Sequence, residues 1–467
     1  MLLTVTEYIV FVILVLVVIT ILVGLGCLIR ATFMRNKNVR VLRFPQTLTV
    51  ENEKHAQDLL ELLSIKTTSY EDDEAYHTFR EKMKTMFPLI HQYMKREKIN
   101  NNIIFTFKTA TQSKKILFVT HMDTSFGTEE KYADNHEVYG PGAFDSKALL
   151  YATLRAAEEI LADHLTLKTS ITIIVTVDDE TTKKGNEAIV NQFLKQGQFF
   201  NLVIEEGIGI IDPTFLELKS HFALLGVGVT GEVGIRYKVK KTQKSREKLE
   251  SFIEDLQNAN VFKSQVDHNA RRVLSHFAKD MPFHNRFLFS NIWMFRGIVK
   301  SIINADQTEF SKLLKTTFTI STLRENDQQY YCDVTFQLAT HDTISEVVTA
   351  LNQFVKRYDV DYEIINIKQA SKQTSEKMRG YQIVKEAVEN IYQELYVAPY
   401  IITKISDERY LNRVSDCVIR FSPLYYPYQA IIDAENGNEH VMKKSITYGI
   451  NVYKKIIKSY EDESSVL

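Results

Sequence analysis

Cysteine is scarce in this 467-residue chain, and neither sign of charge is in excess. Three cysteines, one of them inside an apolar run (Cys27), exclude a fold built on disulfides and fit a reducing or redox-indifferent compartment. Lys and Arg number 57 against 58 Asp and Glu, so we expect no nucleic-acid partner. With 45% hydrophobic and 25% charged residues, the composition also excludes a disordered, collagen-like or multi-span membrane protein.

The amino-terminal segment contains the longest apolar run of the chain. Tyr8–Ile29 has no charged residue and, as a helix, would be about 33 Å long, enough to cross a bilayer. The run is too long for a soluble core helix, and a signal peptide would begin with basic residues, whereas this one follows Glu7. We therefore predict a single-pass anchor. Basic residues from Arg30 to Arg43 follow it, which favours a cytoplasmic location for the rest of the chain.

After the anchor, short apolar strands alternate with helix-period segments, a pattern typical of an α/β fold with an open, mostly parallel sheet. A central section is rich in alternating strands and predicts a separate α+β insert. The predicted units are an anchor with its basic flank (1–40), the first part of the sheet domain (41–221), the insert (222–360) and the second part of the sheet domain (361–467).

Acidic residues and one histidine follow three of the predicted strands. The motifs are His121-Met-Asp123, Asp178-Asp179-Glu180 and Glu205-Glu206-Gly207, and a glycine-bearing turn, Tyr139–Lys147, carries Asp145 to the start of a helix. Ligands of open α/β sheets lie beyond the carboxyl ends of the strands. These side chains could be helix caps or solvated loop charges, but their ordered placement favours one shared site.

Carboxylates that converge with a histidine repel one another unless a cation compensates them. Mixed histidine and carboxylate ligands suit zinc and, less selectively, manganese or cobalt. A bridging carboxylate with terminal ligands on each side would hold two ions about 3.5–4 Å apart. The pattern therefore predicts a site for two divalent metal ions, with zinc as the best fit.

The same motifs resemble those of the zinc-dependent aminoacylase and carboxypeptidase family that includes acetylornithine deacetylase and succinyl-diaminopimelate desuccinylase. The strings that carry the resemblance are Phe118–Asp123, Tyr139–Lys147, Val177–Glu180 and Val203–Gly207. Within that family the chain looks most like the membrane-anchored carboxypeptidase S and N-acyl-amino-acid hydrolase branch. The resemblance extends from about residue 59 to 459 and implies hydrolysis of an amide or peptide bond by metal-activated water. It also implies that the sheet domain is the catalytic domain and that the insert (222–360) is a lid, through which the chain could form a homodimer as many relatives do.

The resemblance also implies a role for each site residue. His121 and Glu205 would bind the first ion, Asp145 would bridge the two ions, and Glu180 would bind the second. The last metal ligand would be Glu435, where relatives have histidine. Two further residues would be catalytic: Asp179 as the general base and Asp123 as the acceptor that orients the histidine.

Several positions depart from the family pattern. Asp179 is one methylene shorter than the usual glutamate, and an error of about 1 Å in placing a base can cost roughly 100-fold in rate. Glu435 replaces the usual histidine, with His440 nearby as a substitute ligand. Lys241–Ser245 replaces a histidine-bearing lid segment, and Gln337 replaces an arginine that would clamp a substrate carboxylate.

Two hypotheses follow from this mixture of matches and departures. The first is a membrane-anchored di-metal hydrolase that cleaves a small peptide or N-acyl amino acid. The second is a catalytically impaired member of the same family that binds a metal or ligand. The first is favoured because the first four metal-ligand positions remain chemically competent.

Overall fold

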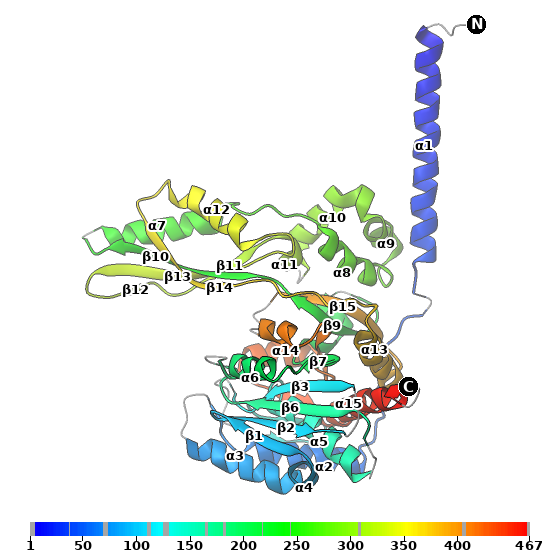
Figure 1. The fold of residues 1–467 in the computed structure, drawn as a ribbon. Helices are drawn as coiled ribbons and strands as arrows, with labels where there is room; N and C mark the ends of the chain where they lie inside the picture. Colours follow the sequence, from blue (N-terminus) through cyan, green and yellow to red (C-terminus); the bar gives the residue numbers. More distant parts are fainter. Residues whose placement is uncertain are drawn as a thin grey trace.

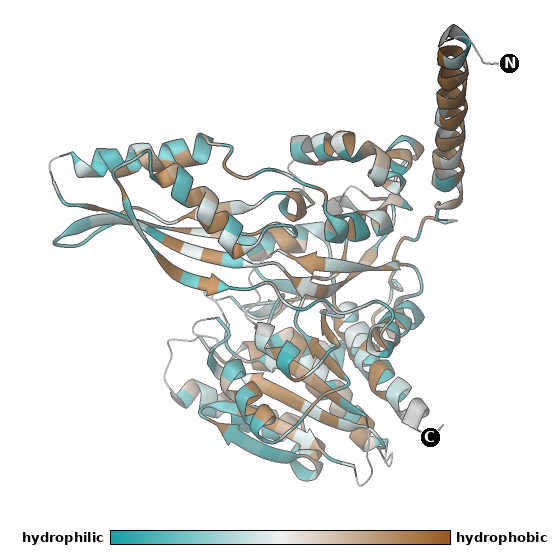
Figure 2. Cartoon of the chain, turned by 45° about the horizontal axis from the view of Figure 1, so that its top comes forward, coloured by the Kyte–Doolittle hydropathy of each residue, from teal (hydrophilic) through white to brown (hydrophobic). Residues whose placement is uncertain are grey.

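The computed structural model describes residues 5–36, 38–68, 73–109, 114–124, 130–163, 167–180, 184–216, 218–242, 244–306, 310–403 and 408–464. Three parts are visible in Figure 1: a long amino-terminal helix, a domain built on a large sheet, and a second, smaller sheet with its own helices. The amino-terminal helix, α1 (Val5–Phe33), stands clear of the rest over most of its length. It is apolar almost throughout, as Figure 2 shows.

The large sheet has ten strands, and its centre is parallel. Along the main path the order is β1-β2-β6-β3-β7-β16-β9-β8-β17, and β15 pairs with β9. The strands are β1 (Lys95–Ile99), β2 (Asn102–Phe107), β3 (Lys115–His121), β6 (Ser170–Thr176), β7 (Leu202–Glu205), β8 (Gly209–Ile211), β9 (Phe222–Val229), β15 (Tyr396–Ile402), β16 (Val418–Arg420) and β17 (Tyr425–Tyr426). Since β6, β3, β7 and β16 run parallel, their carboxyl ends lie at one edge.

Both faces of this sheet are covered, as expected for near-continuous apolar strands. Ile116 and Phe118 of β3 belong to the core under α5 and α15, whereas Leu117 and Val119 belong to the core under α6. The helices of the domain are α2 (Val50–Leu63), α3 (Asp73–Met86), α4 (Pro88–Tyr93), α5 (Lys147–Ala162), α6 (Lys184–Lys195), α13 (Arg379–Tyr392), α14 (Tyr428–Glu435) and α15 (Lys443–Ser464), with short 3₁₀ helices η1 (Pro213–Leu216) and η2 (Glu408–Arg413). The predicted α/β fold is confirmed.

The lid is an antiparallel sheet in the order β11-β13-β10-β14, with β12 also on β13. Its elements are β10 (Glu232–Lys240), β11 (Thr317–Ile320), β12 (Arg324–Glu325), β13 (Gln329–Gln337), β14 (Asp361–Lys368), α7 (Ser245–Asn258) and α12 (Ile344–Val355). An apolar core of its own joins this sheet to its two helices. The structure places β9 in the large sheet and β14 in the lid, so the lid sheet lies within residues 232–368 rather than 222–360.

In the described residues between α7 and β11, four helices form a separate group beside α1 (Figure 1). They are α8 (His268–Ala278), α9 (Phe283–Ser290), α10 (Ile292–Asp306) and α11 (Ser311–Leu314). Their buried faces join the core of the large domain rather than that of the lid. A small sheet, β18-β5-β4, completes the domain, with β4 (Tyr132–Ala133), β5 (Glu137–Tyr139) and β18 (His440–Met442).

Candidate functional site

The end of β3 supplies the histidine of the site and the residue that orients it. His121 is the last residue of the strand, and Asp123 follows in a fully buried position. One Asp123 carboxylate oxygen lies 3.2 Å from the His121 Nδ1, and the other accepts the Glu180 backbone N–H at 2.9 Å. Asp123 therefore fixes the imidazole ring and directs its Nε2 away from the strand, which is the arrangement typical of a metal-binding histidine.

A tight turn before α5 places Asp145 beside His121. Gly142 has a φ of +91°, and a Cβ there would lie 3.0 Å from three neighbouring side-chain atoms, so the turn needs glycine. The backbone N–H groups of Gly142 and Phe144 donate to the Glu439 carboxylate at 2.9 and 3.0 Å. Burial and the nearby Asp145 charge raise the pKa of Glu439 to about 7. Glu439 thus holds the turn, a role that the sequence analysis did not identify.

The end of β7 presents Glu206, rather than Glu205, to the cluster. An Oε atom of Glu206 lies 3.0 Å from the His121 Nε2. Glu205 is the last residue of the strand, and its carboxylate lies 3.1 Å from the Nε of Arg420, its register partner on β16. Both members of this ion pair are buried, with Arg420 fully so. The sequence analysis assigned the metal-ligand role to Glu205, so the structure differs from that expectation by one residue.

His121, Asp145 and Glu206 form a compact set of ligand atoms, all within 4.8 Å of one another. The His121 Nε2 lies 3.5 Å from an Asp145 oxygen. Burial opposes protonation of His121, but the surrounding carboxylates, Asp179 first among them, raise its pKa well above the usual value.

The pKa values of the two carboxylates, Glu206 and Asp145, shift in opposite directions. Burial and the Asp145 charge raise the pKa of Glu206 well above its usual value. Burial opposes ionisation of Asp145 as well, but its hydrogen bonds with Glu206 and His121 lower its pKa. The raised pKa values of His121 and Glu206 both reflect the repulsion among these buried carboxylates, which a divalent cation would compensate. The residues fit a metal site.

The loop after β6 adds two more acidic residues at the same edge. Asp179 accepts a hydrogen bond from the Asn186 side chain at 3.1 Å. Its negative charge raises the pKa of His121. Glu180 is solvent-accessible; partial burial and the Asp145 charge raise its pKa. Asp178 instead accepts the backbone N–H of Lys184 at the start of α6. Asp179 and Glu180 are therefore the residues of this loop that remain near the cluster.

The carboxy-terminal ligand expected from the sequence lies elsewhere. Glu435 is exposed at the end of α14, and the ligand cluster around His121 in the described chain does not include it. His440 is buried, but its Nδ1 lies 2.8 Å from Glu137 and its Nε2 lies 3.2 Å from Asp433. Among the described residues, neither Glu435 nor His440 lies with the cluster of His121, Asp145 and Glu206.

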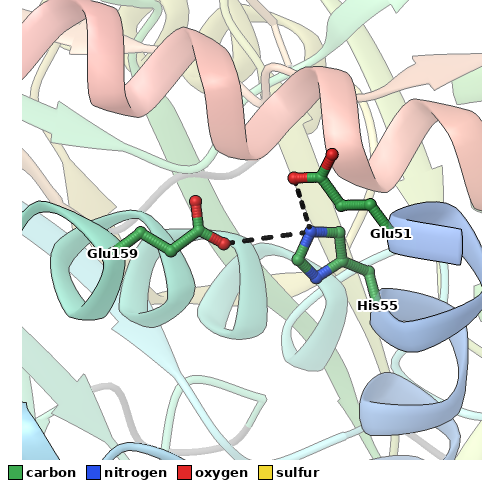
Figure 3. A group of neighbouring side chains, drawn as sticks. All are labelled: Glu51, His55 and Glu159. Carbon is green, nitrogen blue, oxygen red and sulfur yellow. Dashed lines mark ion pairs between the residues drawn. The ribbon is translucent and has the colours of Figure 1, made fainter. Parts of the chain in front are cut away.

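A second group of ligand-type side chains lies between α2 and α5. Figure 3 shows His55 between Glu51 and Glu159, with its Nε2 at 3.5 and 3.9 Å from their carboxylates. Lys454 donates to the other Glu159 oxygen at 2.7 Å, and the nearby Arg155 adds further positive charge. Because Lys454 already pairs with Glu159 and Arg155 pairs with Asp58 at 2.8 Å, we interpret the group as a polar network that joins α2, α5 and α15.

The fold and the cluster together define a class of protein. An open α/β sheet with a histidine and carboxylates at the carboxyl ends of its strands, plus a separate α+β lid, is the architecture of a metal-dependent hydrolase. The family comparison agrees. The model of peptidase family M20/M25/M40 matches residues 117–459, and the chain belongs to this family. It is therefore a metallopeptidase or amidohydrolase by class, as the sequence predicted, and enzymes of this family use a dinuclear metal site.

Relatives of known name match over nearly their full length. A carboxypeptidase S-like protein of Dictyostelium discoideum is 22% identical over 451 residues, covering 88% of this chain and 86% of its own. The N-fatty-acyl-amino acid synthase/hydrolase PM20D1 of Xenopus tropicalis is 22% identical over 488 residues, covering 95% and 94%. These names agree with the branch that the motifs indicated.

Solved structures share the fold at low sequence identity. An M20 family metallo-carboxypeptidase from Sulfolobus solfataricus superposes with a TM-score of 0.59 at 15% identity, covering 88% of this chain and 99% of its own. Human carnosine dipeptidase 1 gives a TM-score of 0.58 at 12% identity, covering 88% and 97%. The likeness supports the two-part architecture of sheet domain and lid.

Proposed function

We propose that the chain is a membrane-anchored metallohydrolase that cleaves an amide bond in a small peptide or an N-acyl amino acid. The observation that carries the proposal is the convergence of His121, Asp145 and Glu206. The Asp123 carboxylate orients the histidine through its Nδ1. The names of the relatives support the substrate class, because they cover carboxypeptidase and N-acyl-amino-acid chemistry.

His121, Asp145 and Glu206 would hold the first divalent ion, with zinc as the best fit to this donor set. Asp145 and Glu180 would hold a second ion more weakly, unless Glu435 moves in from the end of α14. When bound, the ions would lower the pKa of a water molecule and polarise the scissile carbonyl. This assignment replaces Glu205 by Glu206.

Asp179 would act as the general base. Its carboxylate lies near His121, and the side chain of Asn186 restrains it at 3.1 Å. It would take a proton from the attacking water and return that proton to the leaving amine. Gln337 is engaged by Thr230 and the Gly231 carbonyl in the lid, so it would offer a substrate hydrogen bonds at most, without the paired charge of an arginine.

The anchor in this proposal is α1. The segment Glu7–Phe33 has a window of mean hydropathy 3.3 that is not buried at all. The end of the helix, however, is built into the fold: Cys27 is 2% exposed and Ala31 is fully buried. A cleaved signal peptide would leave this contact empty, so we favour an anchor. The basic residues after Arg30 favour a cytoplasmic location, which protease protection of sealed vesicles would test.

The lid could also carry a dimer contact. β14 is an edge strand of the lid sheet, whereas β10 is flanked on both sides. Ile364, Ile365 and Ile367 of β14 are exposed by 41–50%, and an apolar edge strand favours pairing with a second copy. Light scattering should then report a dimer, and Ile365→Lys should shift it toward monomer.

The test of the hydrolase is metal analysis combined with a substrate panel. Purified chain should contain one to two divalent ions and should hydrolyse one or more N-acyl amino acids or dipeptides. A chelator and Asp145→Asn should each abolish turnover. The matched control is Asp163→Asn at the opposite end of α5, which should leave both readouts unchanged.

The second candidate is a catalytically impaired member of the family that binds metal or ligand. The exposed position of Glu435 favours it, because the second ion lacks a terminal protein ligand there. Metal binding without turnover of any substrate, followed by a gain of activity in Asp179→Glu, would establish this candidate and contradict the first.

A further inference from the structure

The two helices α9 and α10 contact α1 within its apolar span. The Asn291 side chain, between the two helices, donates to the Cys27 carbonyl at 3.1 Å, and the Cys27 thiol lies 3.8 Å from the Met294 sulfur. One turn further along α1, the Arg286 Nε donates to the Ala31 carbonyl at 2.8 Å. Figure 1 shows α9 and α10 beside the carboxyl end of α1.

These contacts set the depth of α9 and α10 relative to a membrane that α1 would cross. The uncharged run ends at Ile29, only two residues after Cys27, or about 3 Å along the helix axis. Met294 and Asn291 therefore lie at the level where the hydrocarbon core meets the lipid headgroups. This step rests on the proposed anchor role of α1.

The surface that α9 and α10 expose combines large apolar side chains with polar ones. Phe283, Trp293, Met294 and Ile298 are 46–51% exposed, and His284, Arg296 and Ser301 are exposed beside them. Trp293 and Met294 lie before the kink of α10 at Phe295, and Ile298 follows one turn after Met294. A contiguous apolar patch in a soluble domain marks an interaction surface. Since these apolar side chains adjoin α1, which the proposed anchor places in the bilayer, their continuity with α1 points to lipid as the covering partner.

Basic side chains surround the same patch at headgroup level. A cavity of about 330 Å³ lies where α1, α8 and α10 meet, and its lining includes Arg30, His268, Arg271 and Trp293. Arginine beside a membrane surface interacts with lipid phosphates, and tryptophan prefers the interface between headgroups and hydrocarbon. Cationic and aromatic groups thus lie where an interfacial helix requires them.

We propose that α9 and α10 insert into the membrane interface beside α1 as a second, in-plane contact with lipid. The catalytic domain is then held against the bilayer in one orientation rather than tethered loosely. The Arg286 and Asn291 bonds to α1 carbonyls make the two membrane elements a single unit.

The test uses Trp293, which is the only tryptophan of the chain. Full-length protein is reconstituted into vesicles of phosphatidylcholine with a fraction of phosphatidylserine. Bromine-labelled lipids should quench the Trp293 fluorescence, and the Stern–Volmer constant for aqueous acrylamide should fall about threefold or more relative to unfolded protein. The control is Trp293→Phe combined with Phe199→Trp; residue 199 is half-exposed after α6, so its tryptophan should remain open to acrylamide and unquenched by lipid.

Carbonate washing of the vesicles separates the two proposals. Protein that stays in the membrane while Trp293 remains open to acrylamide and unquenched would contradict the interfacial contact and leave the anchor intact. Protein that carbonate removes would contradict the anchor, and the inference on α9 and α10 would be wrong with it.

Discussion

Substitution of the two adjacent glutamates after β7 should separate metal binding from stability. Glu205 pairs with a fully buried Arg420, whereas Glu206 faces His121. In Glu205→Gln the guanidinium would stay buried without its counter-charge, and breaking a buried pair in this way costs about 3–5 kcal/mol. Glu206→Gln removes a carboxylate whose pKa is already raised by burial and by Asp145, so the fold should lose little.

The stability cost converts into a measurable shift of the melting temperature. An unfolding entropy of about 2.1 cal/mol/K per residue, over roughly 430 residues, gives about 0.9 kcal/mol/K. Glu205→Gln should therefore melt about 3–6 °C below the parent protein in differential scanning calorimetry with chelator present. Glu206→Gln should melt within about 1 °C of the parent under the same conditions.

Metal content gives the complementary readout. Glu206→Gln should lose the more tightly bound ion in elemental analysis and lose hydrolysis by at least about 100-fold, whereas folded Glu205→Gln should keep its metal. The opposite pattern, with metal lost in Glu205→Gln at an unchanged melting temperature and retained in Glu206→Gln, would refute the assignment of the two side chains.

Three further outcomes follow from the geometry. Asp179→Asn should lower kcat by about 100- to 10,000-fold while elemental analysis shows unchanged metal, and a loss of metal instead would mean that Asp179 is a ligand. Asp123→Ala should lower metal affinity about 10- to 100-fold in chelator competition, because the His121 ring loses its restraint. Burial lowers the pKa of His55 below 6.5, so stability should fall as the pH drops below about 6.5. His55→Gln should flatten that dependence in urea unfolding, and an unchanged slope would exclude His55 as its source.

Most of the metal cluster could be read from the strand ends. His121 and Asp145 follow from two simple rules: ligands collect at the carboxyl ends of parallel strands, and a glycine turn can carry a carboxylate to a helix start. Both rules depend on local sequence, so they can be applied without a structure. The two residues are adjacent in the structure, as those rules lead one to expect.

The choice between Glu205 and Glu206 could not be made in the same way. It depends on Arg420, more than 200 residues away, which pairs with Glu205 across neighbouring strands. The close approach of Gly207, where a Cβ would lie 2.3 Å from the Arg420 backbone, brings the two segments together just after Glu206. A buried arginine is stable only when an acidic side chain pairs with it, but the sequence alone does not show which acidic residue forms that ion pair.

The boundary between the large sheet and the lid sheet lies between β9 and β10. β9 (FALLGVGV) is almost entirely apolar and buried along its whole length, whereas β10 (EVGIRYKVK) alternates between buried and partly exposed residues from Ile235 onward. β9 joins the large sheet and β10 joins the lid. Gly231 lies between them, at the point where the chain passes from one sheet to the other. Both halves have strand propensity, but only β9 has the near-continuous apolar pattern of a strand covered on both faces, whereas β10 has the alternation of a strand covered on one face.

Closure of the site over a substrate would require the lid to move relative to the large domain. β9 leads directly into β10, and the chain returns from β14 through α13 to β15 of the large sheet. The chain also passes from α7 of the lid to α8 and from α11 back to β11, so four connections join the described parts of the lid and the large domain. If α9 and α10 fix the large domain to the bilayer, the lid is the part left free to move. Replacing the exposed Trp293 and Ile298 by aspartate should then weaken membrane contact while the His121 cluster keeps its metal. A parallel loss of metal in that variant would show that the two regions are coupled through the core.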